Sequence, residues 1–316
     1  MTASFRFRLI AALAAVYVVW GSTYLAILIA IETLPGFAMA GVRFLSAGAL
    51  LYAARRWAGD PPPTRSQWQA TAIIGGLLLM GGNGGVVWAE HYVPSGIAAV
   101  IVATLPLWMA LLRWLVYKEG PPNRPTTWGI AMGLAGVLLL AWPSLFPAEG
   151  MGEQGLYLPA VVVLLGACLS WAIGSLYSRE ADLPSSAWMT TAAQMLTGGA
   201  MLMVLSTVSG EWQDFDAEAV SLRSILALGY LVIFGAIIAY SAYIWLLRNA
   251  DATLASTYAY VNPVIALALG WMLANETLSA RDAVAASLIV AAVALVSRSS
   301  TAAPSEAEDE TSVGQT

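Results

Sequence analysis

The segment TLPLWMALLRWLVYKEG, residues 104–120, decides the fold because the chain repeats its pattern later. The later segment is VNPVIALALGWMLANET, residues 261–277. The corresponding residues, each 157 positions apart, are Pro106 with Pro263, Trp114 with Trp271 and Glu119 with Glu276. An internal repeat of this kind predicts two structural units with related folds.

Two further matches extend the repeat toward the N-terminus of each unit. WGSTY at 20–24 resembles IGSLY at 173–177, and LPGFAMAGVRFLSAG at 34–48 resembles LPSSAWMTTAAQMLTGG at 183–199. We therefore expect a first repeat over residues 9–143 and a second over residues 156–298. The remaining segment, residues 299–316, is acidic, has no apolar pattern and is predicted to be disordered.

The composition predicts that the surface faces lipid. Of the 316 residues 59% are hydrophobic and only 10% are charged, whereas soluble domains carry about 25% charged residues. A single cysteine, Cys168, and a single histidine, His91, cannot build a metal site. Lys118 is the only lysine and follows no glycine-rich phosphate loop, and a net charge of −5 does not fit a nucleic-acid binder. We expect no cofactor, metal or nucleic-acid partner.

Ten apolar runs are long enough to cross a bilayer, which takes about 20 residues of helix. Short polar segments such as RRWAGDPPPTRSQ and KEGPPNRP separate them. The predicted spans are residues 8–30, 36–54, 69–90, 94–117, 126–143, 156–178, 186–209, 222–247, 252–274 and 280–298.

The spans predict an all-α, polytopic membrane protein with two inverted repeats. Each repeat holds five spans, and an odd number makes the second repeat enter the membrane in the opposite sense. Basic residues place both termini in the cytosol, because only Arg223 and Arg281 then fall on outer segments. The basic residues on the cytosolic segments are Arg6, Arg8, Arg55, Arg56, Arg65, Lys118, Arg124, Arg179, Arg248 and Arg298.

Several motifs also resemble a known family. They are VWGSTYLAI at 19–27, LPGFAMAGVRFLSAG at 34–48, GGNGGVVWAEHYVPSGIAAVIVATLPLW at 81–108, and the glutamate thirteen residues after a proline in both halves. The chain resembles the EamA-type drug/metabolite transporter superfamily and, within it, the YedA-like exporters. The resemblance implies ten helices in two repeats, the bacterial inner membrane as location, and secondary export of small metabolites or drugs. It implies no particular substrate.

Inverted repeats are typical of secondary transporters, in which rocking of the two halves alternately exposes a site near the midplane. We predict an exporter of small amphipathic or amino-acid-like solutes rather than an enzyme. One alternative is a membrane-embedded transferase, but a lone peripheral histidine and the absence of paired midplane carboxylates argue against it. A passive facilitator or channel is another alternative. Protons remain a candidate coupling ion, and the oligomeric state stays open.

Arg43 is the clearest candidate for contact with substrate, because it lies about 10 Å into the second span. Glu90 is the nearest counter-ion by depth. Arg43 either receives an anionic group of the substrate, with Glu90 holding it in the meantime, or forms a permanent structural pair with Glu90 or a carbonyl. Gln194 occupies the place of Arg43 in the second repeat. The full set of predicted cavity residues is Trp20, Ser22, Tyr24, Arg43, Asn83, Trp88, Glu90, Trp171, Gln194, Tyr240, Tyr243, Tyr260 and Asn262.

Two prolines and two glutamates are predicted to act in the conformational change. Pro106 and Pro263 each remove a helix hydrogen bond and are candidate hinges, with a static kink as the alternative. Glu119 and Glu276 end their spans, where a carboxylate opposes the helix dipole. We interpret them as gating or structural residues rather than substrate ligands, with a solvated interfacial acid as the alternative.

The third span carries an unusual run of glycines, GGNGGVVW at 81–88, which the repeat aligns with IAYSAYIW at 238–245. Asn83 therefore corresponds to Tyr240. Small residues allow helices to approach closely in lipid. We expect the glycines to serve close packing, cavity space or both, with Asn83 on the side of the cavity.

Overall fold

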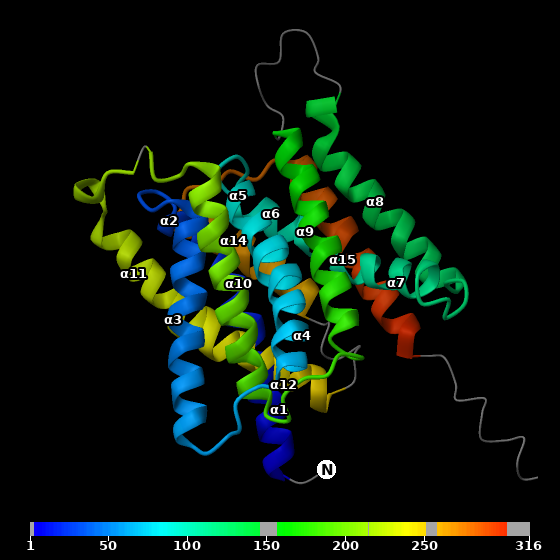
Figure 1. The fold of residues 1–316 in the computed structure, drawn as a ribbon. Coiled ribbons are helices and arrows are strands. Elements are labelled where there is room, and N and C mark those ends of the chain that lie inside the picture. The colour runs from blue at the N-terminus through cyan, green and yellow to red at the C-terminus, as the bar shows by residue number, and fades with distance from the viewer. Residues whose placement is uncertain (1–2, 146–156, 214, 251–257, 302–316) are drawn as a thin grey trace, which may run out of the picture.

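The computed structural model describes residues 3–145, 157–213, 215–250 and 258–301. Every regular element within these ranges is a helix (Figure 1). In chain order they are α1 Ala3–Ala15, η1 Val16–Trp20, α2 Gly21–Ala30, α3 Gly36–Trp57, α4 Arg65–Gly75, η2 Gly76–Asn83, α5 Gly84–Ala89, α6 Ser95–Val102, α7 Leu105–Leu115, α8 Arg124–Leu145, α9 Leu158–Tyr177, α10 Ala187–Ser209, η3 Ala217–Ala219, α11 Leu222–Tyr230, η4 Leu231–Tyr240, α12 Ser241–Asn249, α14 Tyr258–Leu273 and α15 Ala280–Thr301.

Eight of the predicted spans are confirmed by length and apolar composition. They are Phe5–Ala30, Gly36–Trp57, Arg65–Ala89, Ser95–Leu115, Arg124–Trp142, Leu158–Tyr177, Ala187–Ser209 and Leu222–Leu247. The predicted ninth span begins in residues outside the described ranges, and its described part is α14. The tenth coincides with α15. The count of ten spans and the orientation of the termini stay predictions, and the predicted disordered tail lies largely outside the described residues.

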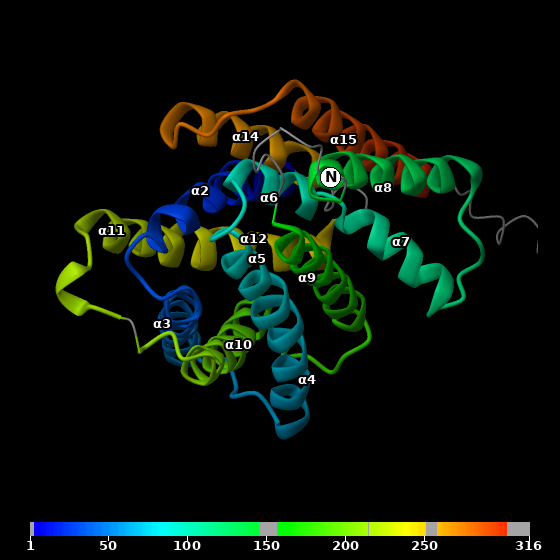
Figure 2. The ribbon, with the colours of Figure 1, turned by 90° about the horizontal axis from the view of Figure 1, so that it is seen from above.

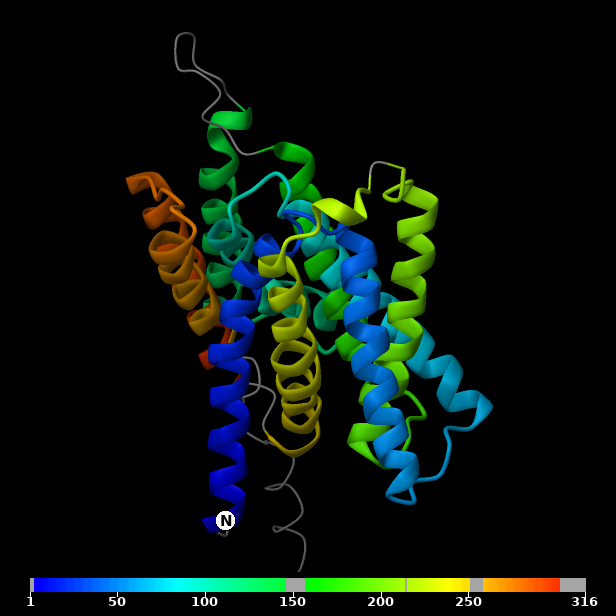
Figure 3. The same cartoon turned by 90° about the vertical axis from the view of Figure 1, so that its left-hand side faces the viewer.

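The helices form two groups around a central region. In Figure 2 α3, α4 and α10 lie on one side, α8, α14 and α15 lie on the other, and α5, α6 and α9 lie between them. The closest neighbours are α3 with α10 and α8 with α15. Figure 3 shows the first helical run, α1 to α2, beside the run α11 to α12; α1 contacts α12 and α2 contacts α11, so these runs are antiparallel.

Local sequence explains where helices in both repeats begin and where α10 ends. The Ser186 hydroxyl accepts a hydrogen bond from the Met189 amide at 3.4 Å and so caps the start of α10. The helix ends at Gly210, whose φ of +79° is the left-handed conformation that glycine adopts without strain. At the start of α4 a reciprocal capping box joins Thr64 and Gln67.

The fourth span is interrupted by a turn shortly before Pro106, as expected from the helix hydrogen bond that a proline removes. The helix α6 ends at Val102 and α7 begins at Leu105, so Pro106 lies in the first turn of α7, where its missing N–H costs nothing. Proline frees the carbonyl four residues earlier, that of Val102. The Cys168 thiol lies 3.8 Å from this oxygen and the Thr104 hydroxyl donates to the Ile101 carbonyl at 2.7 Å. By contrast, Pro263 lies inside the continuous helix α14. Whether either proline acts as a hinge stays a prediction.

Candidate functional site

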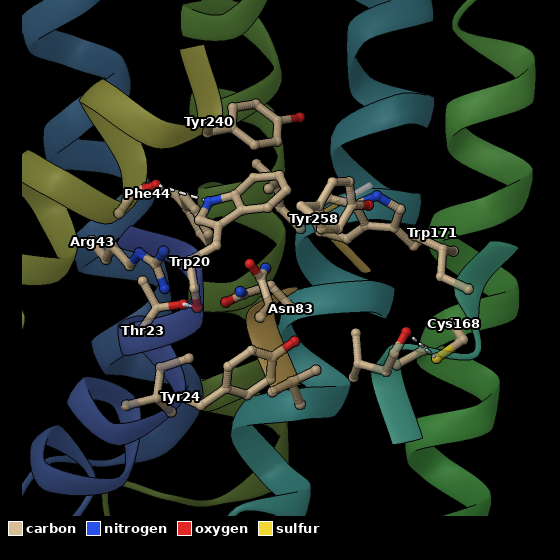
Figure 4. A pocket seen from close by; sticks show the side chains of 18 residues that line it. Trp20, Thr23, Tyr24, Arg43, Phe44, Asn83, Cys168, Trp171, Tyr240 and Tyr258 are labelled. Atoms are coloured by element: carbon tan, nitrogen blue, oxygen red, sulfur yellow. Dashed lines mark hydrogen bonds between the residues drawn. The ribbon is translucent and has the colours of Figure 1, made fainter. Parts of the chain in front are cut away.

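A cavity of about 80 Å³ lies among the helices of the central region (Figure 4). That volume holds several water-sized groups. Its walls come from η1, α2, α3, η2, α5 and α6–α7 in the first half of the chain, and from α9, η4 and α14 in the second. The lining residues are Trp20, Thr23, Tyr24, Ile27, Arg43, Phe44, Leu79, Asn83, Val86, Val102, Leu105, Ala167, Cys168, Trp171, Gly235, Tyr240, Tyr258 and Asn262.

Arg43 projects from α3 into this cavity and is 3% exposed. Its guanidinium carbon lies 4.7 Å from the centre of the Phe44 ring, within the range of a cation–π contact. A Cβ added at Gly235 would lie 2.8 Å from Arg43 Nη2, so the guanidinium fits only because this position of η4 has no side chain. Nε and Nη1 have no hydrogen-bond partner among the described residues. The cavity therefore contains a buried cation with unused donors.

Glu90 follows α5 directly and is also buried, but it does not line the cavity. Neither of its carboxylate oxygens has a hydrogen-bond partner among the described residues. No ion pair within 4.0 Å joins it to Arg43. The direct Arg43–Glu90 pair considered from the sequence is thus not formed in this conformation. These two are the only charged side chains that are buried in the described part of the chain.

Aromatic rings form the wall around Trp20. The Trp20 ring centre lies 4.9 Å from that of Tyr243 and meets Trp171 and Tyr258 edge-on at 5.8 and 5.3 Å. Such tilted and edge-to-face contacts are the favoured geometries of aromatic pairs. Tyr243 supports this wall from behind: its hydroxyl lies 3.4 Å from Trp171 Nε1 and it does not line the cavity itself.

Gln194, the predicted counterpart of Arg43, supports the cavity without lining it. Its side chain on α10 is completely buried, and its Oε1 accepts a hydrogen bond of 2.7 Å from the Tyr240 hydroxyl. The Gln194 Nε2 atom has no partner among the described residues. Gln194 was predicted as the polar counterpart of Arg43. In the structure its side chain orients the Tyr240 hydroxyl instead of lining the cavity.

The two asparagines of the lining differ in how their amides are satisfied. Asn83 Oδ1 is buried and has no partner among the described residues. Asn262, with its amide oriented to satisfy its neighbours, donates to the carbonyls of Tyr258 and Tyr17 at 3.3 and 3.1 Å. Asn262 therefore ties α14 to η1, while Asn83 leaves an acceptor available to a ligand. Tyr24 lines the cavity as predicted.

Three predicted candidates lie elsewhere or cannot be placed. Ser22 is hydrogen-bonded to the hydroxyl of Tyr230 at 2.6 Å and does not line the cavity. Trp88 packs instead against Tyr92, with ring centres 4.9 Å apart. The side chain of Tyr260 lies outside the described set, although its backbone is in α14. Ser22 and Trp88 therefore lie outside the cavity lining in this conformation.

Tyr258 is the main lining residue that sequence reasoning missed. It is 8% exposed and its ring lies edge-on to both Trp20 and Tyr243. The signal was present, since Tyr258 precedes Asn262 by four residues and so shares its helical face. Thr23, Phe44 and Gly235 were missed as well, because they carry no chemistry that singles them out.

Each π-helical segment in the structure ends at a residue of the cavity wall. The segments η1, η2 and η4 end at Trp20, Asn83 and Tyr240. A π-helix inserts an extra residue into the turn, and such segments occur frequently at functional sites. The insertion changes which side chain faces inward, so the three residues reach one cavity from three different spans.

The gate candidates Glu119 and Glu276 share one backbone motif. Each follows a residue with positive φ, Lys118 at +54° and Asn275 at +53°. Each glutamate amide donates back six residues at 3.1 Å, to the carbonyls of Arg113 and Gly270 respectively. The same combination of a left-handed residue and a backbone hydrogen bond spanning six residues thus occurs at corresponding positions of the two halves.

The carboxylates of these two residues bind different partners. Glu276 accepts hydrogen bonds from the amides of Ser95 and Gly96, at 2.7 and 3.1 Å, and so caps the start of α6. Glu119 is half-exposed and accepts a hydrogen bond of 2.6 Å from Arg113 Nε. The helix dipole favours an acid at a helix N-terminus. The Glu276 carboxylate is therefore stabilised by the start of α6, although it is disfavoured by the C-terminal end of its own helix.

A third acid, Glu211, was not singled out from the sequence. It follows α10 and accepts from the amides of Phe37 and Ala38, at 2.9 and 3.1 Å, at the start of α3, the helix that carries Arg43. The Ser206 hydroxyl donates to the same carboxylate at 2.7 Å. The helix α3 begins after Pro35 without a side-chain cap of its own. Its capping residue lies more than 170 residues away in the chain, so only the folded structure identifies it.

On the cytosolic side of the predicted topology, Asp60 follows α3 and pairs with Arg55 through two hydrogen bonds of 2.8 Å. These bonds lower the pKa of the Asp60 carboxyl to about 2, with further contributions from the Ser186 hydroxyl and Arg56. Within the described ranges no three His, Cys, Asp or Glu side chains gather in a way that could hold a metal ion.

Comparison with known proteins gives a consistent family. The model of the EamA-like transporter family matches residues 7–142 and 158–298. The chain is 46% identical over 298 residues to the uncharacterised inner membrane transporter YedA of Escherichia coli strain K12, covering 92% of each chain. It is 30% identical to an uncharacterised transporter encoded in the trpA 3' region of Buchnera aphidicola, over 80% of this chain and 81% of that one.

A solved structure titled "Crystal structure of protein" has a similar fold. The TM-score is 0.63 at 21% sequence identity, with 92% of this chain and 96% of that chain covered. At this identity the likeness concerns the fold alone.

Proposed function

The chain belongs to the EamA-like transporter family, and from this premise we propose that it is a secondary transporter that exports small metabolites or drugs through the central cavity. The Escherichia coli relative is named an inner membrane transporter, and the chain is accordingly a multi-pass protein of the inner membrane. Export, substrate range and mechanism are the part that we propose.

The observation that carries the proposal is the origin of the cavity wall. Trp20, Arg43 and Asn83 come from the first segment matched by the family model, and Trp171 and Tyr240 come from the second. A site between two related halves is where alternating-access transporters bind their substrates. Its buried polar atoms without partners, on Arg43 and Asn83, are groups that a substrate can satisfy.

We propose further that the halves are inverted repeats of five spans, with both termini in the cytosol and ten spans in total. The matching backbone turns at Glu119 and Glu276, each with a left-handed residue before the glutamate, support this because they occur at positions 157 residues apart. In this topology the two glutamates end their helices on opposite sides of the membrane. We assign them to gating, with Glu276 holding the start of α6 in the conformation described.

The broken fourth span supports a moving element. Residues 103 and 104 form a turn between α6 and α7, shortly before Pro106, and the flanking residues Val102 and Leu105 line the cavity. Discontinuous helices near the midplane are typical of secondary transporters. We assign Pro106 as a hinge residue on this basis, and Pro263 as the second hinge because it corresponds to Pro106 in the repeat.

The test is counterflow in proteoliposomes that contain the purified full chain, with a panel of amino acids, aromatic acids, amines and drugs. The expected result is saturable exchange of at least one compound. Exchange of none on a broad panel would refute the proposal. Repeating the assay with and without a pH gradient decides between proton-coupled export and passive facilitation.

A matched pair of variants connects exchange with the cavity. Trp20→Ala removes a ring from the cavity wall, whereas Trp128→Ala removes a ring that is 68% exposed on α8. We expect exchange to be lost in the first variant and retained in the second. Equal rates in both would mean that the substrate does not pass through this cavity.

A further inference from the structure

The guanidinium of Arg43 lacks the partner that a buried charge requires. Arg43 is 3% exposed, and two of its three nitrogens have no acceptor among the described residues. An unpaired buried charge is strongly destabilising, and in a membrane such residues are retained for function. The missing partner is therefore expected to come from outside the chain.

The wall of the cavity supplies no counter-ion. Arg43 is the only charged residue in the lining, which contains neither Asp nor Glu. Glu90 forms no ion pair with it. A ligand that enters the cavity thus meets one positive charge and no negative charge.

The rest of the wall determines the body of such a ligand. The Trp20 and Tyr258 rings are in edge-to-face contact, with centres 5.3 Å apart. The Trp171 and Tyr240 ring centres lie 5.8 and 6.5 Å from that of Trp20 and 6.4 Å from each other. Figure 4 shows Arg43 and Thr23 at one end of these rings and Trp171 at the other. Aromatic walls bind flat apolar groups by stacking and edge contacts. The cavity thus has a cationic end and an aromatic end.

Resting on the transport function proposed above, we propose that the substrate is a monoanionic carboxylate with a flat, apolar body. Its carboxylate accepts hydrogen bonds from Arg43, a charge-assisted contact that is about twice as strong as a neutral one, and its body lies against Trp20 and Tyr258. A donor on the body, such as an indole N–H, satisfies Asn83 Oδ1.

A zwitterionic amino acid fits this site less well than a monoanion. Its ammonium group would have to leave water without a carboxylate among the lining residues to receive it, and burial of an unpaired charge is costly. A monoanion instead makes the complex with Arg43 neutral. An ammonium compound without a carboxylate is excluded by repulsion from Arg43.

Three probes with the same ring system separate these cases: indole-3-propionate as the monoanion, indole-3-propionamide as its neutral isostere, and tryptophan as the zwitterion. Binding to the full chain in lipid nanodiscs is measured by calorimetry. We expect the acid to bind about tenfold or more tightly than the amide, in line with a charge-assisted bond, and more tightly than tryptophan. Equal affinities of acid and amide, no binding of the acid, or preference for tryptophan would each overturn the assignment.

Variants assign the preference to Arg43. Arg43→Gln is expected to reduce the preference for acid over amide to below about threefold, while Arg43→Lys, which keeps the charge, retains part of it. Arg65→Gln is the control, because Arg65 is an exposed basic residue at the start of α4, outside the cavity lining. If Arg43→Gln does not fold, Arg43→Lys and the three probes on the unmodified chain still decide the question.

Counterflow in the same preparations distinguishes failure of this inference from failure of the proposed function. Exchange of neutral or cationic compounds without any preference for acids refutes the carboxylate assignment and leaves transport intact. Tight binding of the acid with no exchange of any compound refutes transport and leaves the assignment of the anion site.

Discussion

The third and eighth spans both depart from regular α-helix through a π-helical segment, but the two segments carry side chains of opposite size. Each contains a π-helical segment, η2 or η4, and each segment ends at a cavity residue, Asn83 or Tyr240, at positions that correspond in the repeat. Around these positions the third span carries glycines, while the eighth carries tyrosines and alanines. The irregular backbone is thus common to both halves, and the side chains differ.

The glycines of the third span serve close packing against α9. A Cβ added at Gly81 would lie 2.3 Å from Ser170 Oγ, at Gly82 2.7 Å from Trp171 Cε3, and at Gly85 2.9 Å from Ala167 Cβ. The Ser170 hydroxyl also donates to the Leu77 carbonyl at 2.7 Å. The question left open by the sequence is therefore answered in favour of packing for these glycines, while Asn83 lies on the cavity wall.

The eighth span carries tyrosines, Tyr240 and Tyr243, at the positions that correspond to Asn83 and Val86 of the third span. Tyr240 lines the cavity and donates to Gln194, and Tyr243 stands behind Trp171. The third span thus allows α9 to pack closely against it, whereas the eighth span supplies aromatic side chains to the cavity wall and its support. The comparison teaches that a repeat can conserve backbone geometry while its two copies divide the work of building one site.

The largest effect is expected where a glycine of the third span meets backbone. In Gly75→Ala the new methyl would lie 2.5 Å from the Gln194 carbonyl oxygen and 3.0 Å from the Gly198 nitrogen, and neither can yield without moving α10. We expect a loss of about 3 kcal/mol in the free energy of unfolding, measured by chemical denaturation in detergent.

Gly166→Ala is the control for this prediction, because nothing lies within 4 Å of a Cβ added there. It should leave stability unchanged or raise it by up to about 1 kcal/mol through helix propensity. Equal losses in the two variants would mean that helix packing does not depend on Gly75.

The second prediction makes the two halves alike at the cavity. Asn83→Tyr places in the third span the residue that the eighth carries as Tyr240 and fills the cavity with a second ring. We expect exchange in proteoliposomes to be abolished while the protein folds, since a cavity of about 80 Å³ can accommodate part of the ring. Asn83→Ala removes the amide acceptor but leaves the space, and should weaken exchange without abolishing it; complete loss in both variants would point to the amide rather than the volume.

The third prediction concerns the Tyr240 hydroxyl of the eighth span, which has no equivalent at Asn83, the corresponding position of the third span. Tyr240→Phe removes the donor to Gln194 Oε1 and leaves a completely buried amide without a partner. The expected cost is about 2 kcal/mol of unfolding free energy. Tyr230→Phe is the control, because Ser22 keeps its bond to the Val19 carbonyl when the Tyr230 hydroxyl is lost. A smaller loss for Tyr240→Phe than for this control would contradict the assigned role of Gln194.

The smallest effect is expected when an alanine of the eighth span is replaced by the glycine found at the corresponding position of the third span. Ala239 corresponds to Gly82, and Ala239→Gly costs about 1 kcal/mol through helix propensity. The reciprocal Gly82→Ala should cost more, because its methyl meets the rigid ring of Trp171 at 2.7 Å. Thermal unfolding of the two variants measures the difference, and the reverse order would show that α9 does not rely on Gly82.

Most of the fold was predictable from the sequence because a bilayer imposes long apolar runs with polar breaks. The predicted span 222–247, for example, coincides with Leu222–Leu247. The cavity was predictable in part: Arg43, Asn83 and Tyr240 were selected for their chemistry and all line it. That these residues contact substrate stays a prediction.

The remainder depends on backbone geometry and on tertiary contacts. The π-helical segments shift the helical register, so a regular period cannot decide which of Tyr240 and Tyr243 faces the cavity. Glu211 caps α3 from a distant part of the chain, and no local pattern announces such a contact. The absence of an Arg43–Glu90 pair likewise follows from where two helices come to lie, which depth in the membrane does not determine.

The position of Cys168 allows access to the cavity to be measured in the unmodified protein. It is the only cysteine of the chain, and its thiol lies in the cavity wall opposite the broken fourth span. Alkylation by a small maleimide therefore reads the opening of one site in the unmodified protein, without the removal of background thiols that such labelling usually demands. A ligand that occupies the cavity should slow the labelling, and the dependence of that rate on ligand concentration gives an occupancy curve by mass spectrometry alone.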